Sequence, residues 1–349
     1  MYSKTKFFLG ANSNIDFVSY FGQLHGQNSS MQLLILKGGP GSGKSSLMKR
    51  IADFAEKKAH RLEIIPCASD PSSLDAVIDY TANFAVMDGT SPHTEDPTLP
   101  GVYHHILYTG DLWDCSKLYD KREDISKLSA QISDCHKGAG SYIKAASSLL
   151  GENMRYAEKF ICREKAAKVI NQIAEKINSG KKGGEEKRLL SALTVGELKV
   201  FSKTPHSLSD TIYVINDTWG AAADFILKGI YTLARLKEEP LIYCPCSLMP
   251  KKCDHLIFPE SRISVLTGNN HLKFEGGETI NGDKFYDEMP LVKDMEMRLA
   301  SAEKLLPRAC NLIKKAKKLH DDLEAYYVGA MDFSQMDKIF DSVINRFYM

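Results

Sequence analysis

The sequence predicts an α/β protein in which a parallel sheet lies between layers of helices, and three observations support this fold class. First, a glycine-rich stretch, residues 38–45, follows an apolar run at residues 33–36. Second, Leu47, Ile51 and Phe54 then recur at helical spacing, which predicts a helix with one face against a sheet. Third, the pattern around this stretch returns later in the chain, which predicts two tandem copies of one unit.

The residue types of the glycine-rich stretch are those of a phosphate-binding loop. Glycines allow a backbone that turns consecutive N–H groups inward, and the N-terminus of the following helix adds partial positive charge. We expect Lys44 to reach the β and γ phosphates of a nucleotide and Ser45 to hold Mg²⁺ through its hydroxyl oxygen. The predicted nucleotide-binding residues are Gly38, Gly39, Pro40, Gly41, Ser42, Gly43, Lys44, Ser45 and Ser46.

Length and composition favour a two-domain protein of the cytoplasm. The chain has 349 residues, 43% of them apolar, which suffices for packed cores. Its eight cysteines lack the spacing of a small disulfide scaffold and fit free thiols in a reducing compartment. No signal segment or membrane helix is predicted, because no apolar run approaches about 20 residues. A formal net charge of +1 gives no general attraction to nucleic acids or to anionic membranes.

The internal repeat has a constant offset over its first part. Cys67 falls on Cys246, 179 residues later, and the surrounding residues follow the same offset. The offset shortens to 172 and then to 170 towards the end of the unit, as a deletion in a second-copy loop would produce. We therefore predict two copies, residues 1–180 and 188–349, joined by a polar linker at residues 181–187. Each copy is expected to carry an appended helical region.

The second copy of the loop has lost the residues that phosphate binding requires. At the offset of 179 residues, Ala223 replaces Lys44 and Asp224 replaces Ser45. The bulky Trp219 prevents the close backbone approach of a phosphate cradle, and acidic groups there would repel a triphosphate. The sequence therefore predicts one nucleotide site per chain and a second copy that is a structural pseudo-domain.

Two further strands are expected in the first copy, at residues 62–66 and 84–87. Both are almost entirely apolar, which suits a parallel sheet with helices on both faces. The loops at the C-terminal ends of such strands converge on a ligand. Asp88 follows the second of these strands directly and resembles the second motif of P-loop NTPases, which implies that it holds Mg²⁺ directly or through water. Asp88 with Gly89 also fits an ordinary strand-end turn.

Two stretches on the same edge carry groups suited to acid–base chemistry. Residues 67–75 combine a turn signal with a helix cap, and residues 90–97 are dense in acids and contain a histidine. Asp70, His93 or Glu95 is predicted to orient a water molecule or a substrate hydroxyl. The alternative is that each belongs to ordinary loop chemistry.

The second copy separates these residues into two groups. It replaces Asp70, Asp88 and His93 by uncharged residues, which links the three to the task of the intact loop. It keeps an aspartate, Asp254, at the place of Asp75. We therefore interpret Asp75 as structural.

The loop at residues 37–45 and its flanks resemble the P-loop NTPase superfamily. Together with residues 67–75 and 88–93, the loop resembles an uncharacterised family of bacterial duplicated P-loop ATPases found in spore-forming Firmicutes and their relatives. The resemblance covers nearly the full chain and implies a three-layer parallel-sheet P-loop NTPase fold in two tandem copies, with ATP and Mg²⁺ as ligands. Both halves of that family usually carry an intact loop, so this sequence departs from it, and no mechanism with two active sites is implied.

Amphipathic helices are expected after Asp114 in the first copy and at residues 312–347 in the second. They are predicted to close the core of each domain or to pack the two copies together; the alternative is a surface for a protein partner. The lysines at residues 314–318 are interpreted as a solvated face and not as a nucleic-acid site. Cys244 and Cys246 are interpreted as buried thiols, because their spacing is not that of a zinc knuckle.

The function that follows is ATP binding with slow or partner-stimulated, Mg²⁺-dependent hydrolysis. Gly89 stands where many ATPases carry a catalytic glutamate, so rapid hydrolysis is not expected. The sequence has no NKxD-like guanine motif and no LSGGQ-like transporter signature. Two alternatives stay open: a small-molecule kinase with Asp70 near the acceptor hydroxyl, and a non-enzymatic nucleotide sensor.

Overall fold

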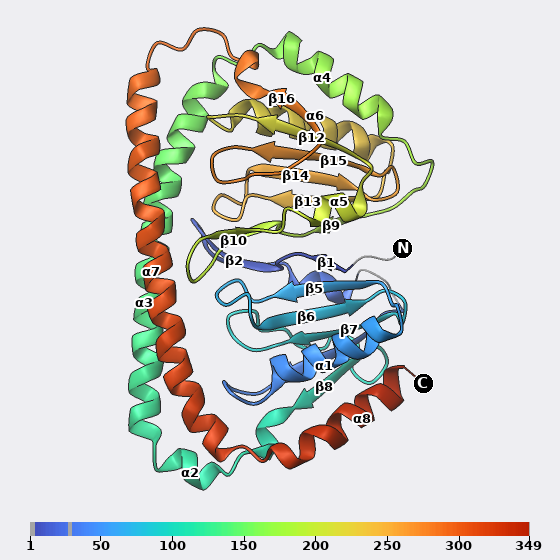
Figure 1. Ribbon diagram of the computed structural model, residues 1–349, viewed down its shortest axis with the longest axis vertical. Coiled ribbons are helices and arrows are strands. Elements are labelled where there is room, and N and C mark those ends of the chain that lie inside the picture. The colour runs from blue at the N-terminus through green and yellow to red at the C-terminus, as the bar shows by residue number, and fades with distance from the viewer. Residues whose placement is uncertain (1–3, 27–29, 349) are drawn as a thin grey trace.

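The chain forms two mixed β-sheets that are joined by a long pair of helices (Figure 1). This arrangement comes from a computed structural model, which describes residues 4–26 and 30–348. Each large sheet has six strands. Strands and helices alternate along the chain, which confirms the predicted α/β class.

The first sheet has the strand order β1-β5-β6-β7-β4-β8. Strand β4 is parallel to β7 and β8, and β1 is parallel to β5. Strand β6 runs antiparallel to both of its neighbours, so the predicted all-parallel sheet is wrong here. The two strands predicted at residues 62–66 and 84–87 are confirmed as β5 and β7. The strands span Thr5–Lys6 (β1), Gln32–Lys37 (β4), Leu62–Pro66 (β5), Leu74–Asp79 (β6), Phe84–Asp88 (β7) and His104–Tyr108 (β8).

The second sheet has the matching order β9-β13-β14-β15-β12-β16. Its third strand, β14, is again antiparallel to both neighbours. The sheets adjoin at their β1 and β9 edges, where Phe8 and Leu189 exchange backbone hydrogen bonds of 2.8 and 2.9 Å (Figure 1). Strand β9 takes up the last three residues of the predicted linker, which is therefore shorter than expected. The strands span Glu185–Lys187 (β9), Thr211–Asn216 (β12), Leu241–Pro245 (β13), Cys253–Phe258 (β14), Ile263–Gly268 (β15) and Glu278–Asn281 (β16).

Long helices cover only one face of each sheet. Helices α1 and α8 lie on the first sheet, and helices α4 and α6 lie on the second. The other faces share one continuous apolar core, to which short connecting segments contribute residues such as Phe21 and Leu190. The predicted three-layer arrangement is therefore wrong, because these segments stand where a second helical layer was expected. The helices span Lys44–Lys57 (α1), Arg163–Lys176 (α4), Ala221–Leu236 (α6) and Met336–Phe347 (α8).

Helices α3 (Arg122–Glu158) and α7 (Val292–Ala330) run antiparallel along one side of both sheets (Figure 1). They have 37 and 39 residues, so they are about 55 and 60 Å long, and each passes from one sheet to the other. Helix α4 of the first half thereby packs on α6 of the second, and α8 of the second half packs on α1 of the first. The appended helices thus pack the two halves of the chain together, and each sheet is covered in part by a helix from the other half.

Short elements complete the described chain. None of the helices within residues 4–26 and 30–348 combines the length and the apolar character needed to span a membrane. The short elements are β2 (Gly10–Ser13), β3 (Asp16–Ser19), η1 (Phe21–His25), η2 (Thr109–Leu112), α2 (Cys115–Tyr119), β10 (Ser191–Leu193), β11 (Leu198–Val200), α5 (Thr204–Leu208), η3 (Gly282–Phe285) and η4 (Phe333–Gln335).

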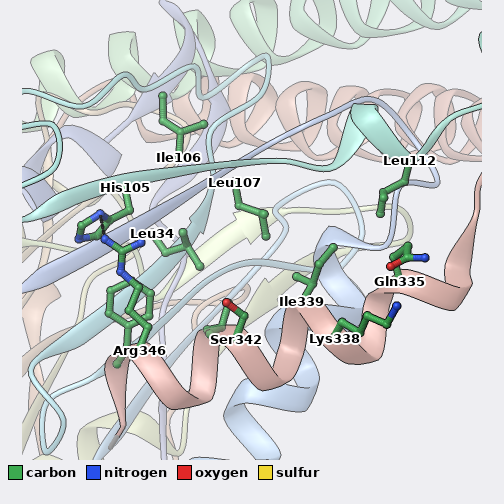
Figure 2. A pocket seen from close by; sticks show the side chains of 12 residues that line it. Leu34, His105, Ile106, Leu107, Leu112, Gln335, Lys338, Ile339, Ser342 and Arg346 are labelled. Atoms are coloured by element: carbon green, nitrogen blue, oxygen red, sulfur yellow. Dashed lines mark hydrogen bonds between the residues drawn. The ribbon is translucent and has the colours of Figure 1, made fainter.

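A cavity of about 350 Å³ lies between α8 and the outer strand β8 (Figure 2). Leu107 and Ile339 contribute apolar surface to it, and Lys338 and Arg346 contribute charged side chains. None of residues 38–45 lines this cavity, so it is separate from the glycine-rich loop.

Candidate functional site

The candidate site is built on the loop between β4 and α1. Gly41 and Gly43 have φ angles of 64° and 81°, which residues with a side chain rarely adopt. This backbone lets α1 begin at Lys44, shortly after the C-terminal end of β4. The loop thus lies at a sheet edge and at a helix N-terminus, where the partial positive charge of the helix favours an anion.

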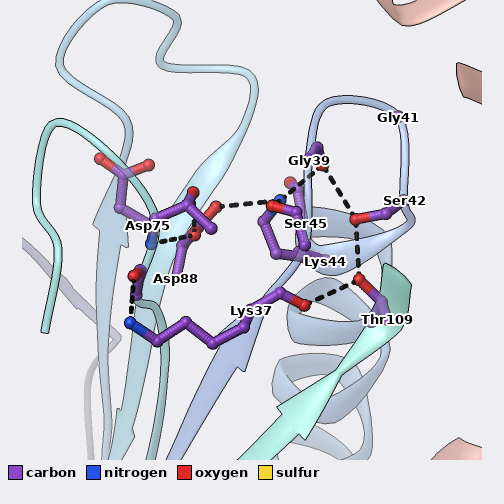
Figure 3. A network of polar contacts seen from close by, with 12 residues as sticks. Lys37, Gly39, Gly41, Ser42, Lys44, Ser45, Asp75, Asp88 and Thr109 are labelled. Atoms are coloured by element: carbon purple, nitrogen blue, oxygen red, sulfur yellow. Dashed lines mark hydrogen bonds and ion pairs between the residues drawn. The ribbon is translucent and has the colours of Figure 1, made fainter. Parts of the chain in front are cut away.

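Lys44 folds back over its own loop (Figure 3). Its Nζ donates hydrogen bonds to the carbonyl oxygens of Gly38 and Gly39, at 2.9 and 2.8 Å. Burial lowers the pKa of the Lys44 ammonium, and the carboxylate of Asp88, 3.7 Å away, acts in the opposite direction. The ammonium therefore already lies in the loop, where phosphate oxygens could replace the two carbonyl oxygens as its hydrogen-bond acceptors.

Asp88 ends β7, and its Cα pairs with that of Leu36 in the neighbouring strand β4. Its Oδ1 accepts hydrogen bonds from the N–H and the hydroxyl of Thr90, at 2.9 and 2.6 Å. The other oxygen, Oδ2, faces Lys44. The strand-end turn that was the alternative interpretation of Asp88 is therefore formed, and its second carboxylate oxygen still faces the loop.

Asp75 also lies at this edge, contrary to its interpretation as a structural residue. Residues 67–75 form a turn that leads into β6, so the predicted helix cap is wrong. The N–H of Leu74 donates to Ser45 Oγ at 3.0 Å, which ties the start of β6 to the loop. Asp75, the next residue, is only 8% exposed. Burial and the nearby Asp88 carboxylate raise the pKa of Asp75 to about 8.

His93 is buried next to Asp75. Its Nε2 lies 3.9 Å from Asp75 Oδ1, and neither ring nitrogen has a hydrogen-bond partner among the described residues. The ring stacks on Phe21, with the ring centroids 4.6 Å apart. Burial lowers the pKa of His93, so the imidazole is neutral at pH 7. The structure therefore brings His93 to the edge where the sequence expects it.

Asp70 and Glu95 are held by other partners. Asp70 accepts hydrogen bonds from the N–H and hydroxyl of Ser72, at 3.1 and 2.6 Å, and lies 3.4 Å from Lys317 of α7. Burial acts against these contacts, which nevertheless lower the pKa of Asp70. Glu95 Oε2 lies 3.2 Å from His25 Nε2. In the part of the chain that the structure describes, neither carboxylate forms an ion pair with the lysine of the loop.

The C-terminal end of α7 covers the loop, which sequence reasoning missed. Glu324 Oε1 accepts a hydrogen bond from the N–H of Gly41 at 3.2 Å. A Cβ atom on Gly41 would lie 2.9 Å from Val328 Cγ2, so the helix leaves room for glycine alone. Gly41 and Glu324 are 283 residues apart in the chain. Helical periodicity identifies a face of α7 but not the loop that this face meets, so no sequence signal predicts the contact.

The corresponding loop of the second half is closed by its own side chains. The carboxylate of Asp217 accepts a hydrogen bond from the N–H of Ala223 at 2.8 Å. The hydroxyl oxygen of Tyr286 accepts hydrogen bonds from the N–H groups of Ala221 and Ala222, at 3.1 and 2.7 Å. The same hydroxyl donates to Asp217, and burial together with that carboxylate raises the pKa of Tyr286. The donors at the N-terminus of α6 are therefore already engaged.

The described cysteines are free thiols. Cys244 is buried, as interpreted from the sequence, whereas Cys246 is only half-buried. Cys244 on β13 and Cys253 on β14 are fully buried, and burial raises the pKa of both. His255 is buried nearby, and burial lowers its pKa to about 4. Cys253 and Cys244 pack in the two apolar cores that adjoin the second sheet.

Comparison with known proteins gives no match: no protein-family model, no curated protein and no solved structure matches this chain. The chemistry of the site is therefore inferred from its own residues.

Proposed function

We propose that the chain binds one Mg²⁺–ATP at residues 38–45 and hydrolyses it slowly, or faster when a partner stimulates it. A single observation carries this proposal: one sheet edge gathers a glycine loop at a helix N-terminus, a buried lysine within that loop and the Asp88 carboxylate. This set of groups suits a nucleotide with its metal ion.

The loop supplies donors for the phosphates. Phosphate oxygens can accept hydrogen bonds from the backbone N–H groups at the start of α1, where the helix dipole adds attraction. The Lys44 ammonium needs to leave only two carbonyl oxygens to reach them. The exchange is favourable because hydrogen bonds between ionised partners are stronger than those to neutral carbonyls.

The residues present fit a magnesium ion. Ser45 Oγ and the Asp88 carboxylate offer the hard oxygen ligands that Mg²⁺ prefers. When bound, the ion would neutralise charge on the β and γ phosphates. Asp88 would hold the ion beside the loop, and Lys44 would position the phosphate oxygens.

We place one nucleotide site in the chain. The first loop keeps its lysine, whereas the donors of the second are occupied by Asp217 and Tyr286. The matching strand orders support an origin of the two halves by internal duplication, and the second half would then have become a structural partner of the first.

Hydrolysis requires a group that orients a water molecule. His93 is neutral, buried and without a hydrogen-bond partner among the described residues, so its ring nitrogens are available as acceptor and donor. Gly89 supplies no carboxylate next to Asp88, which is consistent with slow turnover. We assign His93 the role of positioning the attacking water.

A nucleotide sensor is the second candidate, and the contact between Glu324 and Gly41 favours it. Helix α7 extends from this contact to the second sheet, so displacement of Glu324 would reach the other half. No observation favours the small-molecule kinase, because Asp70 already pairs with Ser72 and Lys317.

Phosphate release from ATP, measured with and without a panel of cell metabolites, separates these functions. An ATPase releases phosphate without any addition, and His93→Ala lowers the rate by about 10²- to 10⁴-fold while nucleotide affinity is kept. Binding without phosphate release in any mixture favours the sensor. Transfer of phosphate to one metabolite identifies a kinase and overturns the first proposal.

A further inference from the structure

The two halves carry a buried aspartate at the same place. Asp75 is the second residue of β6, and Asp254 is the second residue of β14. Asp254 is 2% exposed, compared with 8% for Asp75. Each follows a turn that is closed by the same backbone hydrogen bond, from Cys67 N to Ser73 O at 3.0 Å and from Cys246 N to Lys252 O at 2.9 Å.

The halves differ in the charge that these aspartates face. Asp254 forms an ion pair with the ammonium of Lys252, whose side chain lies against Gly220 of the second loop. Ser73 stands at the place of Lys252 in the first half. Of the described lysines and arginines, none forms an ion pair with Asp75. Its side chain shares a hydrogen bond with the Cys67 thiol, and His93 Nε2 lies 3.9 Å away.

The charged form of a buried carboxylate is costly when no cation lies beside it, because burial removes its hydration. The second half avoids this cost with Lys252, and the first half has no equivalent side chain. The loop of the first half, in contrast to that of the second, keeps Lys44 and Ser45. The Leu74 N–H bound to Ser45 Oγ places the start of β6 beside a proposed ligand of the magnesium ion.

We infer that Asp75 is a third protein group of the magnesium site, with Ser45 and Asp88, and that it binds the nucleotide-associated divalent cation directly or through a metal-bound water. Lys252 takes the place of that cation in the second half. This inference rests on the proposed nucleotide site. It also explains why the aspartate persists in both halves: each half needs a negative group there, opposite a metal ion in one and an ammonium in the other.

The test compares the affinity for a non-hydrolysable ATP analogue in excess Mg²⁺ with that in excess EDTA, by titration calorimetry on the full chain. The parent should bind more tightly with Mg²⁺. Asp75→Asn should reduce that gain by about 10-fold or more, as expected for loss of a group that supports a metal ion. Asp53→Asn, an exposed acid on α1, is the matched control and should leave the gain unchanged.

Ser73→Lys provides a second variant, because it copies the arrangement of Lys252 and Asp254. The new ammonium should occupy the cation position, so the analogue should bind equally well with Mg²⁺ and with EDTA. Circular dichroism checks that both variants are folded.

The outcomes separate the inference from the function on which it rests. If the parent binds the analogue, and both folded variants show the same increase in affinity with Mg²⁺ as the parent, Asp75 has no role at the metal and the nucleotide site stands. If the parent does not bind the analogue under either condition, the proposed function fails and the inference fails with it.

Discussion

Lys44 is the residue on which nucleotide binding depends most directly. It is buried in the loop without contributing to an apolar core, because its ammonium rests on two carbonyl oxygens. We predict that Lys44→Ala weakens binding of Mg²⁺–ATP by at least about 10-fold, the worth of a hydrogen bond to a charged group. Circular dichroism should show an unchanged fold. A variant that binds as tightly as the parent would show that the loop is not the phosphate site.

Asp75 should make stability depend on pH. Its pKa is about 8 in the folded chain and about 4 in the unfolded chain, so the folded state holds the proton more tightly. The stability that this proton provides is complete below about pH 4 and is lost as the pH rises towards 8.

Asp75→Asn removes this titration. Without metal or nucleotide, the variant should be more stable than the parent at pH 8.5 by about 1–3 kcal/mol, since the parent buries a charge there. The difference should shrink at pH 5, as measured by urea unfolding at both values. A difference that is the same at the two pH values would contradict the raised pKa of Asp75.

Single residues show where the sequence was sufficient and where it was not. Lys44 and Asp88 could be placed because the loop motif and the strand end fix their positions. Asp75 was interpreted as structural because Asp254 repeats it, and the difference lies in its partner: a lysine in one half and Ser73 in the other. Glu95 was a candidate by composition alone, and the structure pairs it with His25.

Helix α7 brings a negative group to the phosphate loop. The Glu324 carboxylate accepts the hydrogen bond of Gly41 N–H that a phosphate oxygen would need, and its charge opposes an incoming triphosphate. We predict that Glu324→Gln tightens Mg²⁺–ATP binding by about 3- to 10-fold, on the order of 1 kcal/mol. The control is Asp322→Asn, because Asp322 is an exposed acid of the same helix that makes none of the loop contacts named here. Equal affinity of the parent and the Glu324 variant in calorimetry would show that α7 does not oppose nucleotide binding at the loop.

Element positions were more predictable than element directions. Apolar runs identified β5 and β7 correctly, because a buried strand needs apolar side chains whichever way it runs. The same runs say nothing about the antiparallel course of β6. They also do not show whether a sheet face is covered by helices or by short segments such as those around Phe21 and Leu190.

The exchange of helices makes the two halves depend on each other. Met336 and Val343 of α8 are buried against the core around α1, and Ile170 of α4 is buried in the core of the second sheet. We predict that a fragment of residues 1–180 does not fold alone, because it lacks α8 and leaves an apolar face exposed. The full chain should show a cooperative thermal transition by circular dichroism, and the fragment should show none. A folded, monomeric fragment would contradict this dependence.

The repeat in the sequence predicts two units, and the chain has two large sheets with matching strand orders, but the repeat does not predict how the halves are connected. A constant offset compares each residue with its counterpart, and such a comparison carries no information about which half a helix packs against. Helices of 37 and 39 residues reach the other sheet by length alone. Which helix of the other half each one packs against is known only from the folded structure of both halves.

The number of nucleotides bound per chain tests the central claim most directly. Titration calorimetry of the full chain with a non-hydrolysable Mg²⁺–ATP analogue should give a stoichiometry near one, and Lys44→Ala should bind at least about 10-fold more weakly. The reason is that Asp217 and Tyr286 occupy the donors of the second loop. A stoichiometry near two, or near one with Lys44→Ala binding as tightly as the parent, would contradict the account.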